Sequence, residues 1–209
     1  VQDWLDAAKI IDSVCDVSAD AISVPIREAS YRVFKDSKRI EKLVGPVDVL
    51  PCGSVEAAPR EPAAVWEELG LFREEHPALL AGNVIMRRER VTACLDAPYG
   101  GFPASTVLGL GSVPQQVMTI ENLTTFHSEA RRRHTENVLL IYTAGMPSPA
   151  WRAMYSRILT DVPTDTPVFH WGDVDEGGFR IASLLAQSAR VTGHELRPWK
   201  MHPDDVPID

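Results

Sequence analysis

The sequence predicts an α/β protein in two parts, with a helical N-terminal part ahead of a parallel sheet flanked by helices. Helical spacing of apolar residues dominates the start of the chain. From residue 115 onward, short apolar runs typical of strands alternate with helical segments. The chain has 209 residues, 44% of them hydrophobic and 24% charged, which suffices for a buried core and argues against a disordered or fibrous protein.

The first 45 residues are expected to be mainly helical. Apolar residues recur at near-helical spacing from Trp4 to Val14, and a second helical pattern follows Pro25. Proline suits the first turn of a helix, and Gly45 suits the end of one.

Residues 51–62 are rich in proline, alanine and glycine and predict a loop before a helix at residues 63–72. Strand-like segments follow in NVIMRRERVTAC, residues 83–94. Short helices followed by such strands are typical of a winged helix-turn-helix, so residues 1–97 are expected to form a winged-helix-like DNA-binding domain. Residues 98–114, rich in glycine and proline, are the expected interdomain link.

Residues 98–209 are expected to form the second domain, a Rossmann-like parallel sheet. Its strands are expected in QQVMTI, NVLLIYT, PVFHW and HELRPWKM, and its helices in NLTTFHSEARRR, PAWRAMYSRIL and EGGFRIASLLAQSAR. Right-handed crossovers place such helices on both faces of the sheet. They also bring the C-terminal ends of the strands to one edge, where α/β folds usually bind ligands.

Three carboxylates are expected at that edge. Glu121 follows directly on QQVMTI, and Asp173 and Asp175 follow directly on PVFHW. Carboxylates gathered closely repel one another unless a cation joins them, and Mg²⁺ or Mn²⁺ is the natural oxygen-loving partner. Glycines beside them, such as Gly172, allow a sharp turn and close approach to a ligand. The alternative is that all three only cap the helices that follow, because aspartate is common at a helix start.

A resemblance favours the metal site. TIENLTTF, IYTAGMPS, FHWGDVDEGGFRIASLL and LRPWKM resemble, in order and spacing, the C-terminal domain of the JetD family, nuclease subunits of the Wadjet anti-plasmid defence system. The similarity covers about residues 101–201, and REASYRVFKDSKRIE resembles the winged-helix segment of the family. Ala144 stands where the family often has glycine.

The resemblance implies a Toprim domain, as in topoisomerases and primases, and a preceding module like the winged helix of type IIB topoisomerase A subunits. Glu121, Asp173 and Asp175 would be its catalytic and metal-binding residues, holding Mg²⁺ or Mn²⁺ for hydrolysis of DNA phosphodiesters. The implied partners are plasmid DNA and an SMC-like ATPase with kleisin and accessory subunits. Cutting both strands implies a homodimer.

Three further residues are candidates for supporting roles. Glu176 is a candidate neighbour of the metal ligands or simply an acidic residue at a helix start. Arg180 and Lys200 are candidate phosphate contacts, although Arg180 also suits a plain surface position.

Two other functions stay open. In type IIB topoisomerase relatives a tyrosine attacks DNA covalently, and Tyr31 lies in a comparable segment. An aromatic at helical spacing near Phe34 also suits core packing. The second alternative is a non-catalytic DNA-binding or assembly module, favoured by a net charge of −8, which restricts DNA contact to local basic patches.

The remaining features indicate a cytoplasmic protein that is not inserted in a membrane. No apolar run reaches 18 residues, and the N-terminus lacks the features of a signal peptide. The three cysteines, Cys15, Cys52 and Cys94, are widely spaced and are expected to be buried, reduced thiols.

Overall fold

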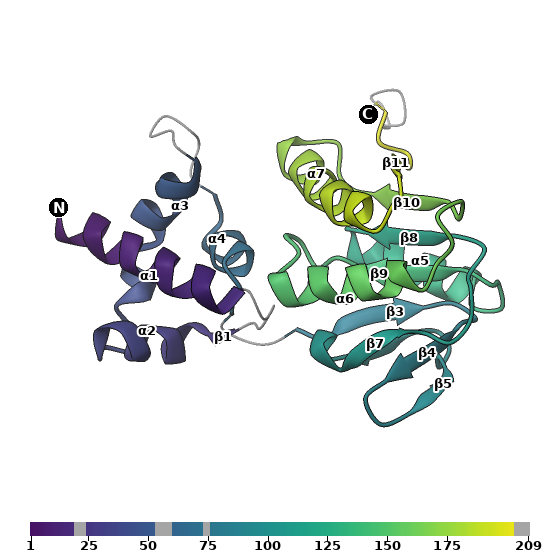
Figure 1. The fold of residues 1–209 in the computed structure, drawn as a ribbon. Helices are drawn as coiled ribbons and strands as arrows, with labels where there is room; N and C mark the ends of the chain where they lie inside the picture. The colour runs from purple at the N-terminus through teal and green to yellow at the C-terminus, as the bar shows by residue number, and fades with distance from the viewer. Residues whose placement is uncertain (19–23, 53–59, 73–75, 203–209) are drawn as a thin grey trace. The chain divides into compact units, whose positions relative to one another are not determined.

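The computed structural model describes residues 1–18, 24–52, 60–72 and 76–202 as a mixed α/β protein (Figure 1). The chain forms two compact units, one mainly of Val1–Glu75 and one of His76–Pro147 with Trp151–Asp209. The expected boundary between residues 97 and 98 lies inside the second unit. The expectation of a link at residues 98–114 was wrong, because this segment contributes two strands to the sheets of the second unit.

The first unit is helical. Its elements are α1 (Gln2–Ser18), β1 (Val24–Pro25), α2 (Ile26–Phe34), η1 (Ile40–Lys42), α3 (Val44–Cys52), α4 (Pro62–Glu68) and β2 (Leu71–Phe72). The core is apolar and is drawn from every helix, with Ala7, Ile10, Ile26, Leu43, Val47 and Trp66 among its buried residues. The expectation that Gly45 ends a helix was wrong, since it lies in the first turn of α3. Most of the expected loop at residues 51–62 falls outside the described residues.

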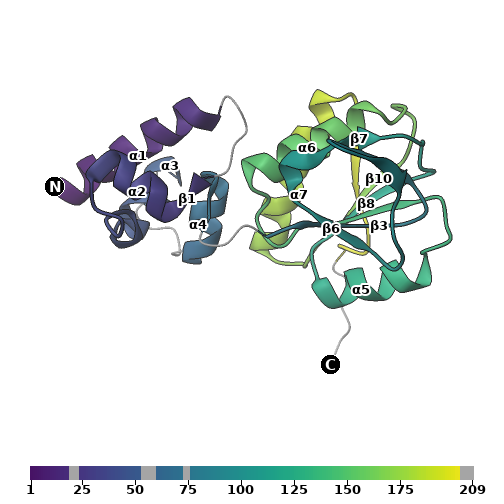
Figure 2. The same ribbon diagram turned by 90° about the horizontal axis from the view of Figure 1, so that it is seen from below.

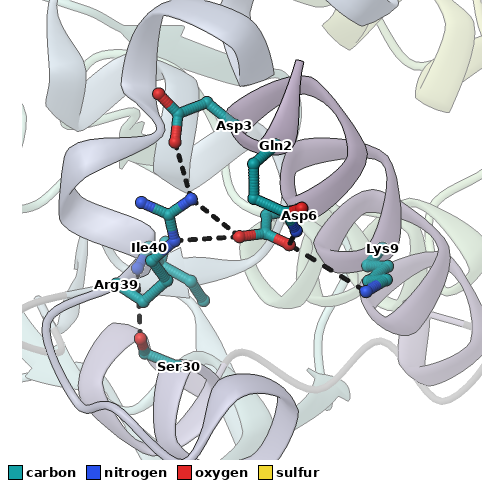
Figure 3. Close-up of polar contacts among 7 residues, drawn as sticks. All are labelled: Gln2, Asp3, Asp6, Lys9, Ser30, Arg39 and Ile40. Atoms are coloured by element: carbon teal, nitrogen blue, oxygen red, sulfur yellow. Dashed lines mark hydrogen bonds and ion pairs between the residues drawn. The ribbon is translucent and has the colours of Figure 1, made fainter.

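A charged network ties α1 to the segment that follows α2 (Figure 3). Arg39 donates from Nε and Nη2 to Oδ2 of Asp6, at 2.9 and 2.7 Å, and from Nη2 to Asp3 at 2.6 Å. Ser30 Oγ accepts a hydrogen bond from the N–H of Ile40 at 3.1 Å. Hydrogen bonds from Arg39 hold the pKa of Asp6 below its usual value, because the guanidinium favours the charged carboxylate.

The second unit is built on a six-stranded sheet. Across the sheet the strands are β11 (Leu196–Pro198), β10 (Val168–Trp171), β8 (Val117–Ile120), β9 (Leu139–Tyr142), β3 (Ala78–Ala81) and β6 (Gly100–Phe102). The first four are parallel, as the sequence predicts. Strand β3 pairs antiparallel with both β9 and β6, an extension that the sequence analysis did not anticipate.

Helices cover both faces of this sheet, also as predicted. Helix α5 (Leu123–Arg132) lies on one face, and α6 (Pro149–Thr160) and α7 (Glu176–Val191) lie on the other (Figure 2). On the α5 face, Met118 and Ile120 of β8 pack with Phe126. Because side chains alternate along a strand, Thr119 of β8 and its neighbour His170 of β10 point to the opposite face.

The strands expected to form the wing of the N-terminal domain belong to the second unit. Strands β4 (Ile85–Arg88) and β5 (Thr92–Cys94) form an antiparallel sheet with β7 (Val107–Leu110), and a short 3₁₀ turn, η2 (Ala104–Thr106), precedes β7. Arg87 of β4 donates to Asp161, beyond the end of α6, at 2.6 Å. This contact ties the small sheet to the helical layer of its own unit.

Two remaining sequence expectations concern cysteines and membranes. Cys94 is exposed, so the expectation of a buried thiol was wrong there, and the side chains of Cys15 and Cys52 lie outside the described part of the chain. Within the ranges described above, no helix has both the length and the apolar character needed to cross a membrane.

Candidate active site

The sheet order brings the ends of β8 and β10 together. The two strands are parallel neighbours, with Ile120 opposite Trp171 at their C-terminal ends. From β8 the chain crosses over α5 to β9 on one side, whereas β10 lies on the other side of β8 and is reached over α6. The carboxyl edge between β8 and β10 is therefore a topological switch point, the usual ligand site of a doubly wound sheet.

Glu121 and Asp173 lie at this switch point and are linked through the backbone. The N–H of Glu121 donates to the carbonyl of Trp171 at 2.9 Å, which extends the strand pairing by one residue. The N–H of Asp173 donates to Oε2 of Glu121 at 3.1 Å. The Glu121 side chain is thus directed across the strand ends, toward the loop that carries both aspartates.

The electrostatics of Glu121 agree with this crowding. Partial burial raises the pKa of Glu121 above its ordinary value, and the hydrogen bond from the Asp173 N–H opposes that change. The charges of Asp173 and Asp175 raise the pKa further. The charges of both aspartates therefore act on Glu121, and its surroundings disfavour the ionised form of this side chain.

The capping alternative is correct for Asp175 and incorrect for Glu121. Asp175 is the N-cap of α7, and its Oδ1 accepts a hydrogen bond from the N–H of Gly178 at 2.8 Å. Helix α5 is capped by Asn122, whose Oδ1 accepts from the N–H of Thr125 at 3.0 Å. Glu121 therefore has no capping role at α5 and is directed at the aspartate loop.

Two glycines shape the loop that carries the aspartates. A Cβ on Gly172 would lie 2.6 Å from Nε2 of His170 and 2.9 Å from Oε2 of Glu121. A Cβ on Gly178 would lie 2.1 Å from the carbonyl oxygen of Asp173. The close approach at these glycines occurs within the protein itself, and the predicted approach to a ligand stays a prediction.

The supporting candidates are distributed around this edge and elsewhere. Glu176 is exposed in the first turn of α7, and Arg180 is partly buried one turn further along. Lys200 is exposed and holds its Nζ 4.7 Å from the ring centroid of Trp171, the last residue of β10. Tyr31 belongs to the first unit and is 58% exposed, so the expectation that it packs in the core was wrong.

His170 is a feature of this edge to which the sequence analysis gave no functional role. It lies within β10 and is fully buried. Its Nδ1 lies 2.9 Å from Oγ1 of Thr119, and its Nε2, beside Gly172, has no hydrogen-bond partner among the described residues. A histidine two residues before a Gly-Asp pair on a strand is the signal that could have drawn attention to it.

The donor chemistry suits a hard divalent cation, but the geometry suits it only in part. Within residues 1–18, 24–52, 60–72 and 76–202, no three His, Cys, Asp or Glu side chains stand at a spacing that would hold a metal ion. Glu121 and Asp173 adjoin one another, whereas Asp175 uses one oxygen for the helix cap. A carboxylate retains acceptor capacity on its second oxygen, so capping and ligation are compatible for Asp175.

The chain resembles known proteins over most of its length. Residues 82–206, more than half of the chain, match the family model described as "Wadjet protein JetD, C-terminal". The Wadjet protein JetD of Bacillus cereus (strain Q1) is 28% identical over 177 residues, which cover 79% of this chain and 42% of that protein. The chain thus spans less than half the length of this relative. The matched residues include the whole carboxylate edge described above.

Proposed function

This chain belongs to the family defined by the C-terminal part of the Wadjet protein JetD, and we propose that it is a Mg²⁺- or Mn²⁺-dependent DNA endonuclease. The observation that carries the proposal is the meeting of Glu121 with the aspartate loop at the switch point of the sheet. A Toprim site would have its carboxylates at this edge. The resemblance of the aspartate loop to the family pattern supports the same reading.

Glu121 and Asp173 would be the principal ligands in this proposal. The pKa of Glu121 is raised mainly by burial and further by the charges of Asp173 and Asp175, and a bound cation would stabilise the ionised form that these effects disfavour. Asp175 would ligate through the oxygen that is not needed for the α7 cap, or would position water beside the cation. The cation, when bound, would orient the scissile phosphate, stabilise the developing charge and lower the pKa of the attacking water.

Basic residues around the carboxylates would contact the phosphates of the DNA backbone. Lys200, exposed beside the end of β10, and Arg180, in the second turn of α7, are the proposed phosphate contacts. Glu176 would not bind the cation itself, and its negative charge would act electrostatically on the metal-binding carboxylates. Because the net charge is −8, such contacts have to be local, and the helical unit of residues 1–75 is proposed to supply the rest of them.

The family also suggests an assembly. We propose that the chain acts on plasmid DNA with an SMC-like ATPase, kleisin and accessory subunits. A two-fold dimer would present one carboxylate site to each strand of the duplex.

The test is incubation of the purified protein with supercoiled plasmid in Mg²⁺, Mn²⁺ or EDTA. We expect metal-dependent linearisation that is lost in Glu121→Gln and in Asp173→Asn, because both changes remove a ligand charge and keep the side-chain shape. Calorimetry with Mn²⁺ on the same proteins measures the site without requiring turnover. The matched control is Asp165→Asn, an exposed aspartate in the loop before β10, at the opposite end of that strand.

The controls separate the possible outcomes. Mn²⁺ binding lost in both site variants and kept in Asp165→Asn would support the metal site even when cutting needs partner subunits. Equal Mn²⁺ affinity in all four proteins, without cleavage, would reject the nuclease proposal and leave the non-catalytic module. The helix cap made by Asp175 is the observation that favours such a module, because capping α7 gives this carboxylate a structural use that needs no metal.

Covalent attack by Tyr31 is a second candidate activity, supported by the exposure of its ring. A tyrosine nucleophile would leave protein attached to the cut DNA end. Tyr31→Phe is expected to retain cleavage if a metal-activated water is the nucleophile. Loss of cleavage together with loss of protein-linked DNA would favour the covalent route.

A further inference from the structure

A buried histidine lies against the carboxylate edge with one nitrogen directed at it. His170 is fully buried, and the alternation of side chains along the strands places it on the face of the sheet opposite α5. Its Nε2 and Oε2 of Glu121 are both close to the position that a Cβ on Gly172 would occupy, at 2.6 and 2.9 Å. The imidazole nitrogen and the carboxylate oxygen therefore both lie close against Gly172.

The hydrogen bonds of Thr119 favour one tautomer of His170. Oγ1 of Thr119 donates its hydrogen to the carbonyl oxygen of Phe169 at 3.2 Å. The hydroxyl has a single hydrogen, so toward Nδ1 of His170, 2.9 Å away, it can act only as an acceptor. With the hydroxyl hydrogen on Phe169, Nδ1 carries the proton and Nε2 presents a bare lone pair toward Gly172, whereas a hydroxyl that donated to Nδ1 would place the proton on Nε2.

The imidazole remains neutral under ordinary conditions. Burial lowers the pKa of His170 to about 4, because a desolvated imidazolium is unfavourable. A second proton on Nε2 is therefore absent near neutral pH, and Nε2 is an acceptor only. Leaving such a buried acceptor unpaired costs about 1–3 kcal/mol, which favours a donor at this place.

Two hydrogen-bond acceptors cannot bond to each other, so a group between Nε2 of His170 and Oε2 of Glu121 has to donate to both. Nε2 offers a lone pair, and the Glu121 carboxylate, when ionised, also only accepts. A water molecule has two O–H groups and can donate one to each. We propose that His170 is a positioning residue for Glu121, sharing with it one water molecule bound beside Gly172.

The consequence concerns the orientation of Glu121. The imidazole ring is fixed by Thr119, and the shared water would transmit that fixed position to Oε2. The N–H of Asp173 holds the same oxygen from the other side, at 3.1 Å. Glu121 would then present its second oxygen, Oε1, to a cation. This last step rests on the proposed nuclease function, whereas the hydrogen bonds to Oε2 do not.

The test is long-range ¹H–¹⁵N spectroscopy of the histidine side chains in the whole chain. We expect the protonated-Nδ1 tautomer for His170, with an Nε2 resonance shifted by a hydrogen bond, and a further shift in Glu121→Gln, whose amide can donate directly. Glu195→Gln, an exposed glutamate in the segment before β11, is the control and is expected to leave the resonance in place. An Nε2 resonance typical of a free acceptor, unchanged in Glu121→Gln, would overturn the proposal.

A second measurement addresses the cation. His170→Leu removes the acceptor, and His170→Gln retains an acceptor oxygen on a side chain of similar reach. We expect Mn²⁺ affinity, measured by calorimetry, to fall about 10-fold or more in His170→Leu and to be partly restored in His170→Gln. Equal affinities in the two variants would reject positioning through the acceptor. If the wild type binds no Mn²⁺, the nuclease proposal fails, and the spectroscopy still decides the case for His170.

Discussion

A single methyl group at Gly172 should separate site geometry from stability. Alanine there would place its Cβ 2.6 Å from Nε2 of His170 and 2.9 Å from Oε2 of Glu121, and ordinary van der Waals contact begins at 3.4 Å. Restoring contact distances requires His170 to retreat by about 0.8 Å and Glu121 by about 0.5 Å, since both atoms meet the same Cβ. The flexible end of Glu121 yields readily, whereas His170 is buried and held by Thr119, so its displacement accounts for most of the cost to folding.

The expected cost to folding is modest, because the backbone of Gly172 is not among the left-handed positions that require glycine. Repacking of this kind costs about 1–3 kcal/mol. The cost to function is larger, since a displacement approaching 1 Å in a catalytic group can reduce a rate on the order of 100-fold. Gly172→Ala should therefore lose plasmid cleavage and Mn²⁺ affinity while unfolding cooperatively at a slightly lower temperature.

Gly177→Ala is the matched control, because its Cβ would meet only Oδ1 of Asp175, at 3.3 Å. Gly177 lies in the first turn of α7, where alanine is the better helix former by about 1 kcal/mol. This variant should melt at the same or a higher temperature and keep its Mn²⁺ affinity. If Gly172→Ala and Gly177→Ala have equal Mn²⁺ affinity, the geometric reasoning about Glu121 is refuted.

Three further predictions concern stability. Ala144 has a left-handed backbone with φ of 59°, so Ala144→Gly should raise the free energy of unfolding by about 0.5–1 kcal/mol, and a lower thermal midpoint would contradict this. The raised pKa of Glu121 means that its proton stabilises the fold and that this stabilisation is lost as pH rises through the folded-state pKa. Denaturant titrations without metal should therefore find Glu121→Gln favoured over the wild type more strongly at pH 7 than at pH 4. Arg39 lowers the pKa of Asp6, whose contribution is present above its ordinary pKa and is lost as pH falls through the folded-state value. Asp6→Asn should accordingly melt below the wild type at pH 7, with a difference that shrinks in acid.

The sequence was sufficient for the second half of the fold because its local signals agree with one another. The four strand segments and three helices expected after residue 115 all occur, in the expected order. Strands buried on both faces give continuous apolar runs, and β8, from Val117 to Ile120, is buried throughout. Right-handed crossovers then fix which ends of the strands meet, so the meeting of Glu121 with the aspartate loop was predictable.

The first half was less predictable because its short segments carry weak signals. Strands β3 and β6 have four and three residues, and β3 joins β9 from a position about sixty residues earlier in the chain. The glycine- and proline-rich segment that suggested a link in fact supplies β6 and β7. Pairing between strands so far apart in the sequence depends on which edge strand of the sheet is still unpaired. A local sequence pattern carries no information about that edge.

The sequence by itself determined the family, the parallel core and the edge at which the carboxylates gather, because apolar periodicity and strand order follow from side-chain burial. Only the tertiary structure decided how those carboxylates are used. Asp175 caps α7, Glu121 turns toward the N–H of Asp173, and both outcomes depend on hydrogen-bond partners that the fold brings together. Only the tertiary structure also showed that His170 is buried with no hydrogen-bond partner for its Nε2 among the described residues, because burial and partners depend on the whole fold.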